Sequence, residues 1–275
     1  RAQGMASDVR GNIWISSFGN NSVYVFEHGN PHQSVGFDQH FGGGPFDIAL
    51  AADGSAWVSN GLGEPPASVA RYALVNGSLE QQFRHFLGQQ LRGISLDSHG
   101  NAWVASQGDN FLYALRAFDG AEIGHFNGGG VDGPWGVAVD GEDNVWVANF
   151  GPLESGPPFT GRLSKLAGVN APPGKNVGDP ISPPTGYTVP TAGSEVLLHN
   201  GAPLYGQGEP PSFIPMMRQT SVVIDQAGNI WSLNNWKPDF DIDASLNPGG
   251  DGIIIFVGLA PPPTTHVHQS PASTR

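Results

Sequence analysis

The sequence contains no cysteine, which excludes disulfide bonds, thiolate metal sites and cysteine nucleophiles. Basic residues are scarce as well: 12 Lys and Arg stand against 24 Asp and Glu, leaving a formal net charge of −12. Because such a chain repels a phosphate backbone, nucleic acid is not expected as a partner, and a cation or a basic partner is favoured. No apolar run approaches the roughly 20 residues of a membrane span, so none is expected.

The missing cysteines leave the redox compartment open. The sequence starts at Arg1 without an initiator methionine, which suggests a processed or truncated product with any signal peptide upstream. We therefore expect an exported protein, either secreted to the extracellular space or periplasmic.

What the sequence does contain is one seven-residue phrase repeated five times. The phrase begins with Asp or Ala, has Asn or Ser at its fifth position and ends with Trp, and its middle residues are typical of a turn. Its copies are 8–14, 51–57, 97–103, 140–146 and 225–231. The tryptophans are 43, 46, 43 and 85 residues apart, so the repeat unit is about 40 to 45 residues, the length of a propeller blade. The 40 Gly and 24 Pro fit turns between many short strands.

The fourth unit shows how a repeat becomes a blade. Segments 135–140 and 144–149 are rich in Val and Ala and are bounded by Asp, Gly and Asn, which predicts a tight hairpin of buried strands. The strand 161–166 follows, and a weaker outer strand is expected near 185–188. The sequence thus predicts an all-β protein, a single β-propeller with five clear four-stranded blades. Residues 195–199 in the long gap are a candidate extra strand, and a sixth, degenerate blade is left open.

This reading divides the chain into two parts. Residues 1–258 would form the propeller, with a long Pro- and Gly-rich insertion at 167–218. Residues 259–275 are rich in Pro, Ser and Thr and would form a C-terminal tail.

The phrases at 133–140, 143–149 and 181–187 resemble the NHL-repeat propellers of bacteria, a group similar to the virginiamycin B lyases and, more distantly, to gluconolactonase-type lactonases. The resemblance implies the fold, but these are scaffold motifs and carry little information on function. By resemblance, a lyase would hold magnesium with His and Glu in repeats that end Trp-Phe-Thr-Glu. Here no Glu ends any of the five repeats, which argues against that activity.

The loops that follow the second strand of each unit differ greatly in length, so one rim of the propeller is the candidate functional face. Around the axial channel we expect two rings of residues. The strand entries contribute Gln3, Phe46, Arg92, Trp135 and Thr220, and the residues three after each Trp are Ser17, Asn60, Ser106, Asn149 and Asn234. Candidate ligand-binding residues from these rings and the adjoining loop are Asn60, Ser106, Trp135, Asn149, Asn234 and Trp236. The alternative is that the rings simply plug the channel.

Asp47 stands out because three of the four equivalent positions in the other repeats hold Gly. With Arg92 expected on the next blade, Asp47 and Arg92 are the candidate catalytic residues. Asp47 could be an acid or base, a metal ligand, or half of an ion pair with Arg92, and the ion pair is favoured.

A second group of carboxylates lies in one loop, at Asp239, Asp241, Asp243 and Asp251. Alternate acidic residues in a flexible loop suit calcium, which takes six to eight oxygen ligands. The pattern departs from the helix-loop-helix calcium motif, because Ala244 replaces the turn Gly and Gly250 replaces the bidentate Glu. The alternative is a solvated acidic loop.

Two functions therefore remain. The favoured one is an exported binding or assembly module that holds a protein, glycan or small molecule at its loop-rich face, with assembly through an open blade edge as a variant. The alternative is a metal-dependent lyase or lactonase at the same face, in which calcium or magnesium polarises a carbonyl and Asp47 moves the proton.

Overall fold

The computed structural model describes residues 1–38, 44–62, 67–151, 161–190, 215–235, 250 and 252–263, and the account below concerns these residues. Blade 1 contains β1 (Ala2–Ser7), β2 (Ile13–Ser17), β3 (Ser22–Phe26) and β4 (Ser34–Asp38). Blade 2 contains β5 (Gly44–Leu50), β6 (Ala56–Leu62), β7 (Ser68–Val75) and β8 (Ser78–Phe86). Blade 3 contains β9 (Leu91–Leu96), β10 (Ala102–Ser106), β11 (Phe111–Leu115) and β12 (Glu122–Phe126).

The remaining two blades each have three strands among the described residues. Blade 4 contains β13 (Pro134–Val139), β14 (Val145–Asn149) and β15 (Arg162–Leu166), and blade 5 contains β16 (Gln219–Ile224), β17 (Ile230–Asn234) and β18 (Ile253–Phe256). Two single-turn 3-10 helices, Phe18–Asn20 and Glu27–Gly29, lie in blade 1. No helix in the described part of the chain has the length and apolarity that a membrane crossing requires.

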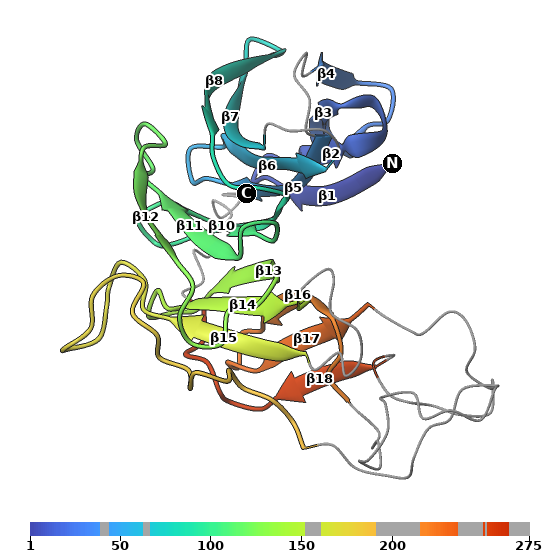
Figure 1. Ribbon diagram of the computed structural model, residues 1–275. Coiled ribbons are helices and arrows are strands. Elements are labelled where there is room, and N and C mark those ends of the chain that lie inside the picture. Colours follow the sequence, from blue (N-terminus) through green and yellow to red (C-terminus); the bar gives the residue numbers. More distant parts are fainter. Residues whose placement is uncertain are drawn as a thin grey trace, which may run out of the picture.

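In each blade consecutive strands pair antiparallel, in the order of the sequence. Figure 1 shows the five sheets following one another about a common axis. The predicted all-β propeller with five blades is confirmed. The expected outer strands exist in blades 1 to 3, whereas the one near 185–188 is reduced to a single bridge between Tyr187 and Leu163. Segment 195–199 lies outside the described residues, and the division into propeller, insertion and tail stays a prediction.

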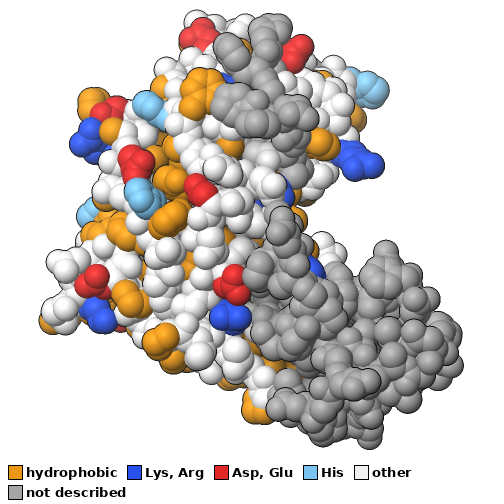
Figure 2. All heavy atoms as spheres, in the orientation of Figure 1, with side chains coloured by type: hydrophobic (Ala, Val, Ile, Leu, Met, Phe, Trp, Pro, Cys, Tyr) orange, Lys and Arg blue, Asp and Glu red, His pale blue; other side chains and the backbone are white. Residues whose placement is uncertain are grey.

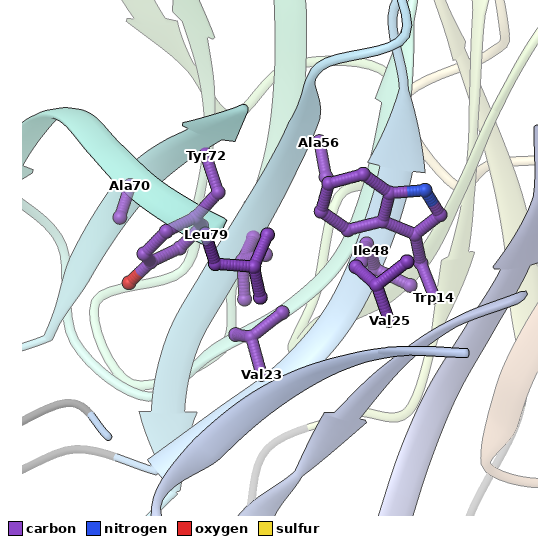
Figure 3. Packing of buried hydrophobic residues seen from close by; sticks show 9 residues of the cluster. Trp14, Val23, Val25, Ile48, Ala56, Ala70, Tyr72 and Leu79 are labelled. Atoms are coloured by element: carbon purple, nitrogen blue, oxygen red, sulfur yellow. The ribbon is translucent and has the colours of Figure 1, made fainter. Parts of the chain in front are cut away.

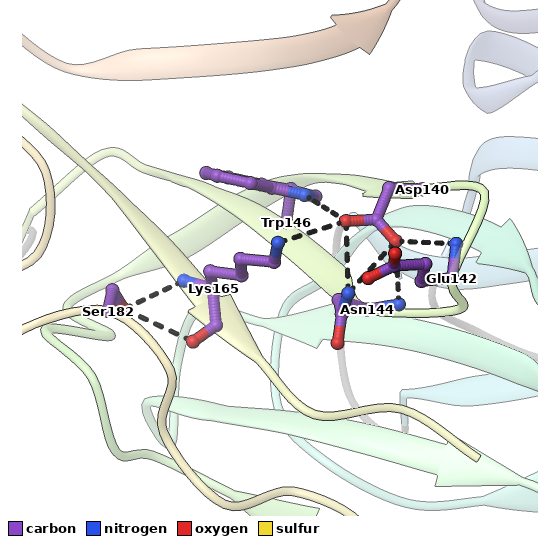
Figure 4. A network of polar contacts seen from close by, with 6 residues as sticks. All are labelled: Asp140, Glu142, Asn144, Trp146, Lys165 and Ser182. Carbon is purple, nitrogen blue, oxygen red and sulfur yellow. Dashed lines mark hydrogen bonds and ion pairs between the residues drawn. The ribbon is translucent and has the colours of Figure 1, made fainter. Parts of the chain in front are cut away.

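The repeat phrase folds as expected into a hairpin whose turn is tied together by its Asp. In blade 4 the Asp140 carboxylate accepts hydrogen bonds from the backbone N–H groups of Glu142 (3.0 Å) and Asn144 (2.9 Å) and from the Trp146 indole Nε1 (2.9 Å). Lys165 Nζ lies 3.2 Å from the same carboxylate, as Figure 4 shows. One side chain therefore satisfies the turn and fixes the orientation of the Trp ring.

The Trp of each phrase then packs against the next blade. Trp14 is fully buried together with Ile48 and Ala56 of blade 2, as seen in Figure 3. Trp57, Trp103 and Trp146 are buried in the same way against blades 3, 4 and 5. The core is thus a series of four similar clusters between blades, as expected where twisted sheets diverge from an axis.

The innermost strands contact one another in the order β1, β5, β9, β13 and β16, while no contact of comparable extent joins β16 to β1 among the described residues. These strands approach closely at the position that is Gly4, Gly93 and Gly136 in blades 1, 3 and 4. A Cβ at Gly93 would lie 2.6 Å from the Trp135 carbonyl oxygen, and one at Gly136 would lie 2.9 Å from Ser221 Cα. Gly is therefore required there by the neighbouring backbone.

Candidate ligand site in the axial cavity

A cavity of about 380 Å³ lies where the innermost strands of all five blades meet. Its walls are formed by Gln3, Phe46, Asp47, Gly93, Trp135, Gly136, Val137, Thr220, Ser221, Val222 and Asn235. Four of the five residues predicted at the strand entries are thus in the wall: Gln3, Phe46, Trp135 and Thr220. A cavity of this volume is within the range of small-molecule sites.

Asp47 is the carboxylate in that wall. Its Oδ1 accepts a hydrogen bond from its neighbour Ile48 N (2.9 Å), and its Oδ2 accepts one from Ile94 N of the next blade (3.1 Å). Burial in the protein raises the pKa of Asp47, and the two N–H groups oppose that rise only in part. A ligand that donates hydrogen bonds or carries positive charge would favour the ionised form.

Arg92 does not pair with Asp47, so the favoured ion-pair interpretation was wrong. The Arg92 guanidinium is buried behind the cavity wall, where its Nε donates to Gln107 Oε1 (2.9 Å) and its Nη2 to Gln90 Oε1 (3.4 Å). Its centre lies 4.4 Å from the Trp135 ring centroid and 5.3 Å from that of Phe46. Burial lowers the pKa of Arg92 to about 10, which leaves it charged at neutral pH. Aromatic faces attract a cation, and this explains why a nearby carboxylate is not needed.

Trp135 and its neighbours form a continuous stack across the blades. The Trp135 ring lies 5.7 Å from Phe46, edge to face, and 4.7 Å from Phe150, stacked. The Arg218 guanidinium in turn lies over the Phe150 ring, 4.5 Å from its centroid. Since the rings hold one another in place, the cavity has a rigid aromatic wall beside its carboxylate.

The predicted polar ring three residues after each Trp lies at the strand ends but does not line the cavity. Asn149 Nδ2 donates to the backbone oxygens of Val147 and Arg162, and its Oδ1 accepts from Asp132 N (2.9 Å). Asn60, Ser106 and Asn234 likewise bond to the backbone of neighbouring segments. These contacts are those of residues that fasten connecting segments, and a ligand-binding role for them stays a prediction.

The remaining predicted residues cannot be placed. Trp236 and the proposed calcium ligands Asp239, Asp241, Asp243 and Asp251 lie outside the described residues. Within the described ranges no group of three or more His, Cys, Asp or Glu side chains could hold a metal ion. The described residues therefore do not fit a resident divalent cation at the cavity, where Asp47 is a single carboxylate.

The pattern of residues three after each Trp did not predict two further residues, Gln107 and Asn235. Gln107 fixes Arg92, and Asn235 lines the cavity. Both are four residues after a Trp, as is Phe150. Each of the three directly follows the last residue of the second strand of its blade, so this position was the one to consider.

No protein-family model matches this sequence, and no curated protein matches it in a sequence comparison. Solved structures do resemble it. A catalytically inactive virginiamycin B lyase from Staphylococcus aureus, determined with quinupristin, is 13% identical, with a TM-score of 0.52 over 94% of this chain and 84% of that one. A candidate gluconolactonase is 15% identical, with a TM-score of 0.51 over 95% and 76%. The Kuenenia stuttgartiensis hydrazine synthase is 14% identical, with a TM-score of 0.59 over 87% and 58%.

At such low identities the likeness extends to the fold alone. It agrees with the resemblance found in the sequence, because both lead to virginiamycin B lyase and gluconolactonase-type propellers. The neighbours include enzymes and proteins of unknown function, so the activity of this chain has to be argued from its own residues.

Proposed function

We propose that this propeller is a binding module whose axial cavity holds a small, hydrogen-bonding molecule with one flat apolar face, of about the size of a monosaccharide. The observation that carries the proposal is the composition of the cavity wall, which sets the Asp47 carboxylate beside the Phe46 and Trp135 rings. An aromatic ring packs against the apolar face of a sugar, while Gln3, Thr220 and Asn235 offer further polar groups.

Three sugars of similar size distinguish the charge that the cavity prefers. We expect glucosamine, which is cationic, to bind more tightly than glucose, and glucuronate to bind most weakly, because Asp47 is the cavity's carboxylate. Binding of glucosamine should weaken as the pH falls through the raised pKa of Asp47, since the carboxyl group is then neutral. Isothermal titration calorimetry with each sugar at several pH values measures both effects.

Two variants test the wall directly. Asp47→Asn keeps the shape but removes the charge, and we expect a loss of about 10- to 100-fold in glucosamine affinity, equivalent to about 1.5–3 kcal/mol. Trp135→Leu should weaken all three sugars several-fold by removing the stacking surface. Phe118→Ala is the matched control, because Phe118 is 82% exposed and lies in a turn of blade 3 away from the cavity.

Failure of all three sugars to bind would overturn the proposed ligand class. Equal binding by wild type and Asp47→Asn would remove Asp47 from the site. No group of His, Cys, Asp or Glu side chains among the described residues favours the alternative, a metal-dependent lyase or lactonase. Export and the loop calcium site stay predictions of the sequence.

A further inference from the structure

The four interfaces between blades share one plan. The face of a blade that carries the phrase Trp packs against the opposite face of the next blade, so each interface joins a Trp face to a receiving face. Between blades 1 and 2, for example, Trp14, Val23 and Val25 contact Ile48, Val58 and Tyr72. In all four interfaces the Trp is 0% exposed.

Blade 5 has a complete Trp face that none of the described residues buries in such a cluster. Val223, Trp231 and Ile255 form one row across its three strands, and Leu233 and Ile253 form the next row. Trp231 is 37% exposed and Ile253 is 58% exposed, in contrast to their buried counterparts in blades 1 to 4. The Trp face of blade 5 therefore has the apolar composition of the other Trp faces, but no described blade packs on it.

Blade 1 has the matching unfilled half. Its receiving face consists of two cross-strand rows, Met5, Ile15 and Tyr24 in one and Ile13 and Phe26 in the other. The position that holds buried Ile48 in blade 2 holds Met5 in blade 1, which is 71% exposed. None of the five residues belongs to a buried apolar cluster of the described chain.

We propose that the Trp face of blade 5 binds the receiving face of blade 1 of a second copy of this protein, head to tail, in the geometry of the interfaces within the chain. The occupant is a second copy because the two uncovered faces are the two halves of one recurring interface, and they do not contact each other extensively within the chain. The proposal is independent of any ligand in the axial cavity.

Charge at the turn end supports the same pairing. Within the chain the turns of adjacent blades meet, as where Ser98 N of blade 3 donates to Asp143 Oδ1 of blade 4 (2.8 Å). A docked copy would bring the turn of Arg10, which is exposed, beside the turn of Asp225. Hydrogen bonds from the Trp231 indole and from Asn229 lower the pKa of Asp225 to about 2, so this carboxylate is ionised at neutral pH. The Arg10 turn carries charges of both signs, Asp8 and Arg10, and of these the Arg10 guanidinium is complementary to Asp225.

Such an interface is heterologous, because different patches of the two copies meet. Each added copy presents both faces again, so association continues, either into a closed ring or into an open filament. Sedimentation velocity of the wild-type chain over a wide range of concentrations should therefore show dimers and larger species that increase with concentration. A monomer at every concentration would overturn the proposal, including closure of blade 5 on blade 1 of the same chain.

Two blocked variants identify the faces. Met5→Lys blocks only the receiving face of blade 1, and Ile253→Lys blocks only the Trp face of blade 5. Both side chains are exposed, so the fold should tolerate the change, which circular dichroism checks. Each variant alone should be monomeric, whereas Phe118→Lys, the matched control at an exposed turn, should associate as the wild type does.

An equimolar mixture of the two variants gives the decisive result. Met5→Lys retains its blade 5 face and Ile253→Lys retains its blade 1 face, so the mixture should form a 1:1 heterodimer that grows no further. Continued self-association of Met5→Lys alone would instead indicate contact between two blade 5 faces and would overturn the head-to-tail arrangement. A mixture that stays monomeric would overturn it as well.

Discussion

Blades 4 and 5 are built on the same phrase, yet the tryptophan of one is fully buried and that of the other is 37% exposed. In both, the indole Nε1 donates to the phrase Asp at 2.9 Å, so the hairpin itself forms alike. What differs is the neighbour, since Trp146 packs on blade 5 and Trp231 has no described blade beyond it. The phrase thus determines the hairpin, and the next blade determines how much the Trp contributes to stability.

Truncating the two tryptophans should give the largest difference between the blades. We expect Trp146→Ala to cost about 3–5 kcal/mol of unfolding free energy, as for other buried aromatic residues. Trp231→Ala should cost about 1–2 kcal/mol, because folding removes less of the Trp231 side chain from water than of the Trp146 side chain. Urea denaturation of both variants measures the contrast, and equal losses would mean that blade 5 is covered in solution.

The phrase carboxylates extend the comparison. Asp140 is paired with Lys165, whose side chain is nearly buried, so Asp140→Ala should cost about 3–5 kcal/mol by leaving that charge unpaired. Asp225→Ala leaves no such cation among the described residues and should cost less. Adding Lys165→Met to Asp140→Ala should recover part of the loss in thermal denaturation. A double variant no more stable than Asp140→Ala would contradict the ion-pair explanation.

Blade 2 offers a gain rather than a loss. It has Ala51 where the other phrases have Asp, and the buried Trp57 Nε1 has no hydrogen-bond partner in the described structure. Ala51→Asp should supply that acceptor and stabilise the chain by about 1 kcal/mol. Ala52→Asp adds the same charge one residue later, on the exposed turn, and is the control. A Tm shift shared by both variants would assign the effect to charge alone.

The smallest effect concerns acid. Because the folded pKa of Asp225 is about 2 and its ordinary value is 3.8, the folded state binds fewer protons between these values than the unfolded state does. The stability that Asp225 contributes is therefore complete above about pH 4 and is lost as the pH falls toward 2. The Tm difference between wild type and Asp225→Asn should shrink over that interval. A constant difference would rule out this linkage.

The five phrases predicted the blades because a hairpin with an Asp, an Asn and a Trp at fixed offsets is a local structure. They also placed Phe46 and Trp135 correctly at the channel, since equivalent strand entries must surround a common axis. The partner of Arg92 was not predictable, because two aromatic rings and Gln107 come from three separate segments. Gln107 and Asn235 could have been identified by their shared position, directly after the second strand of a blade.

On the face seen in Figure 2, basic and acidic side chains lie next to each other at several places, and uncharged groups cover the area between them.

The Trp face of blade 5 and the receiving face of blade 1, which no cluster of described residues covers, also have an evolutionary consequence. Tandem duplication of a segment encoding one repeat could add a blade next to blade 5 or blade 1 without breaking any existing contact between blades. The added blade would cover one of these faces and would itself expose a face of the same kind. A fully circular protein must break a seam before it can gain a member. Selection could thus adjust the diameter of such a molecule, and the width of its bore, by whole modules.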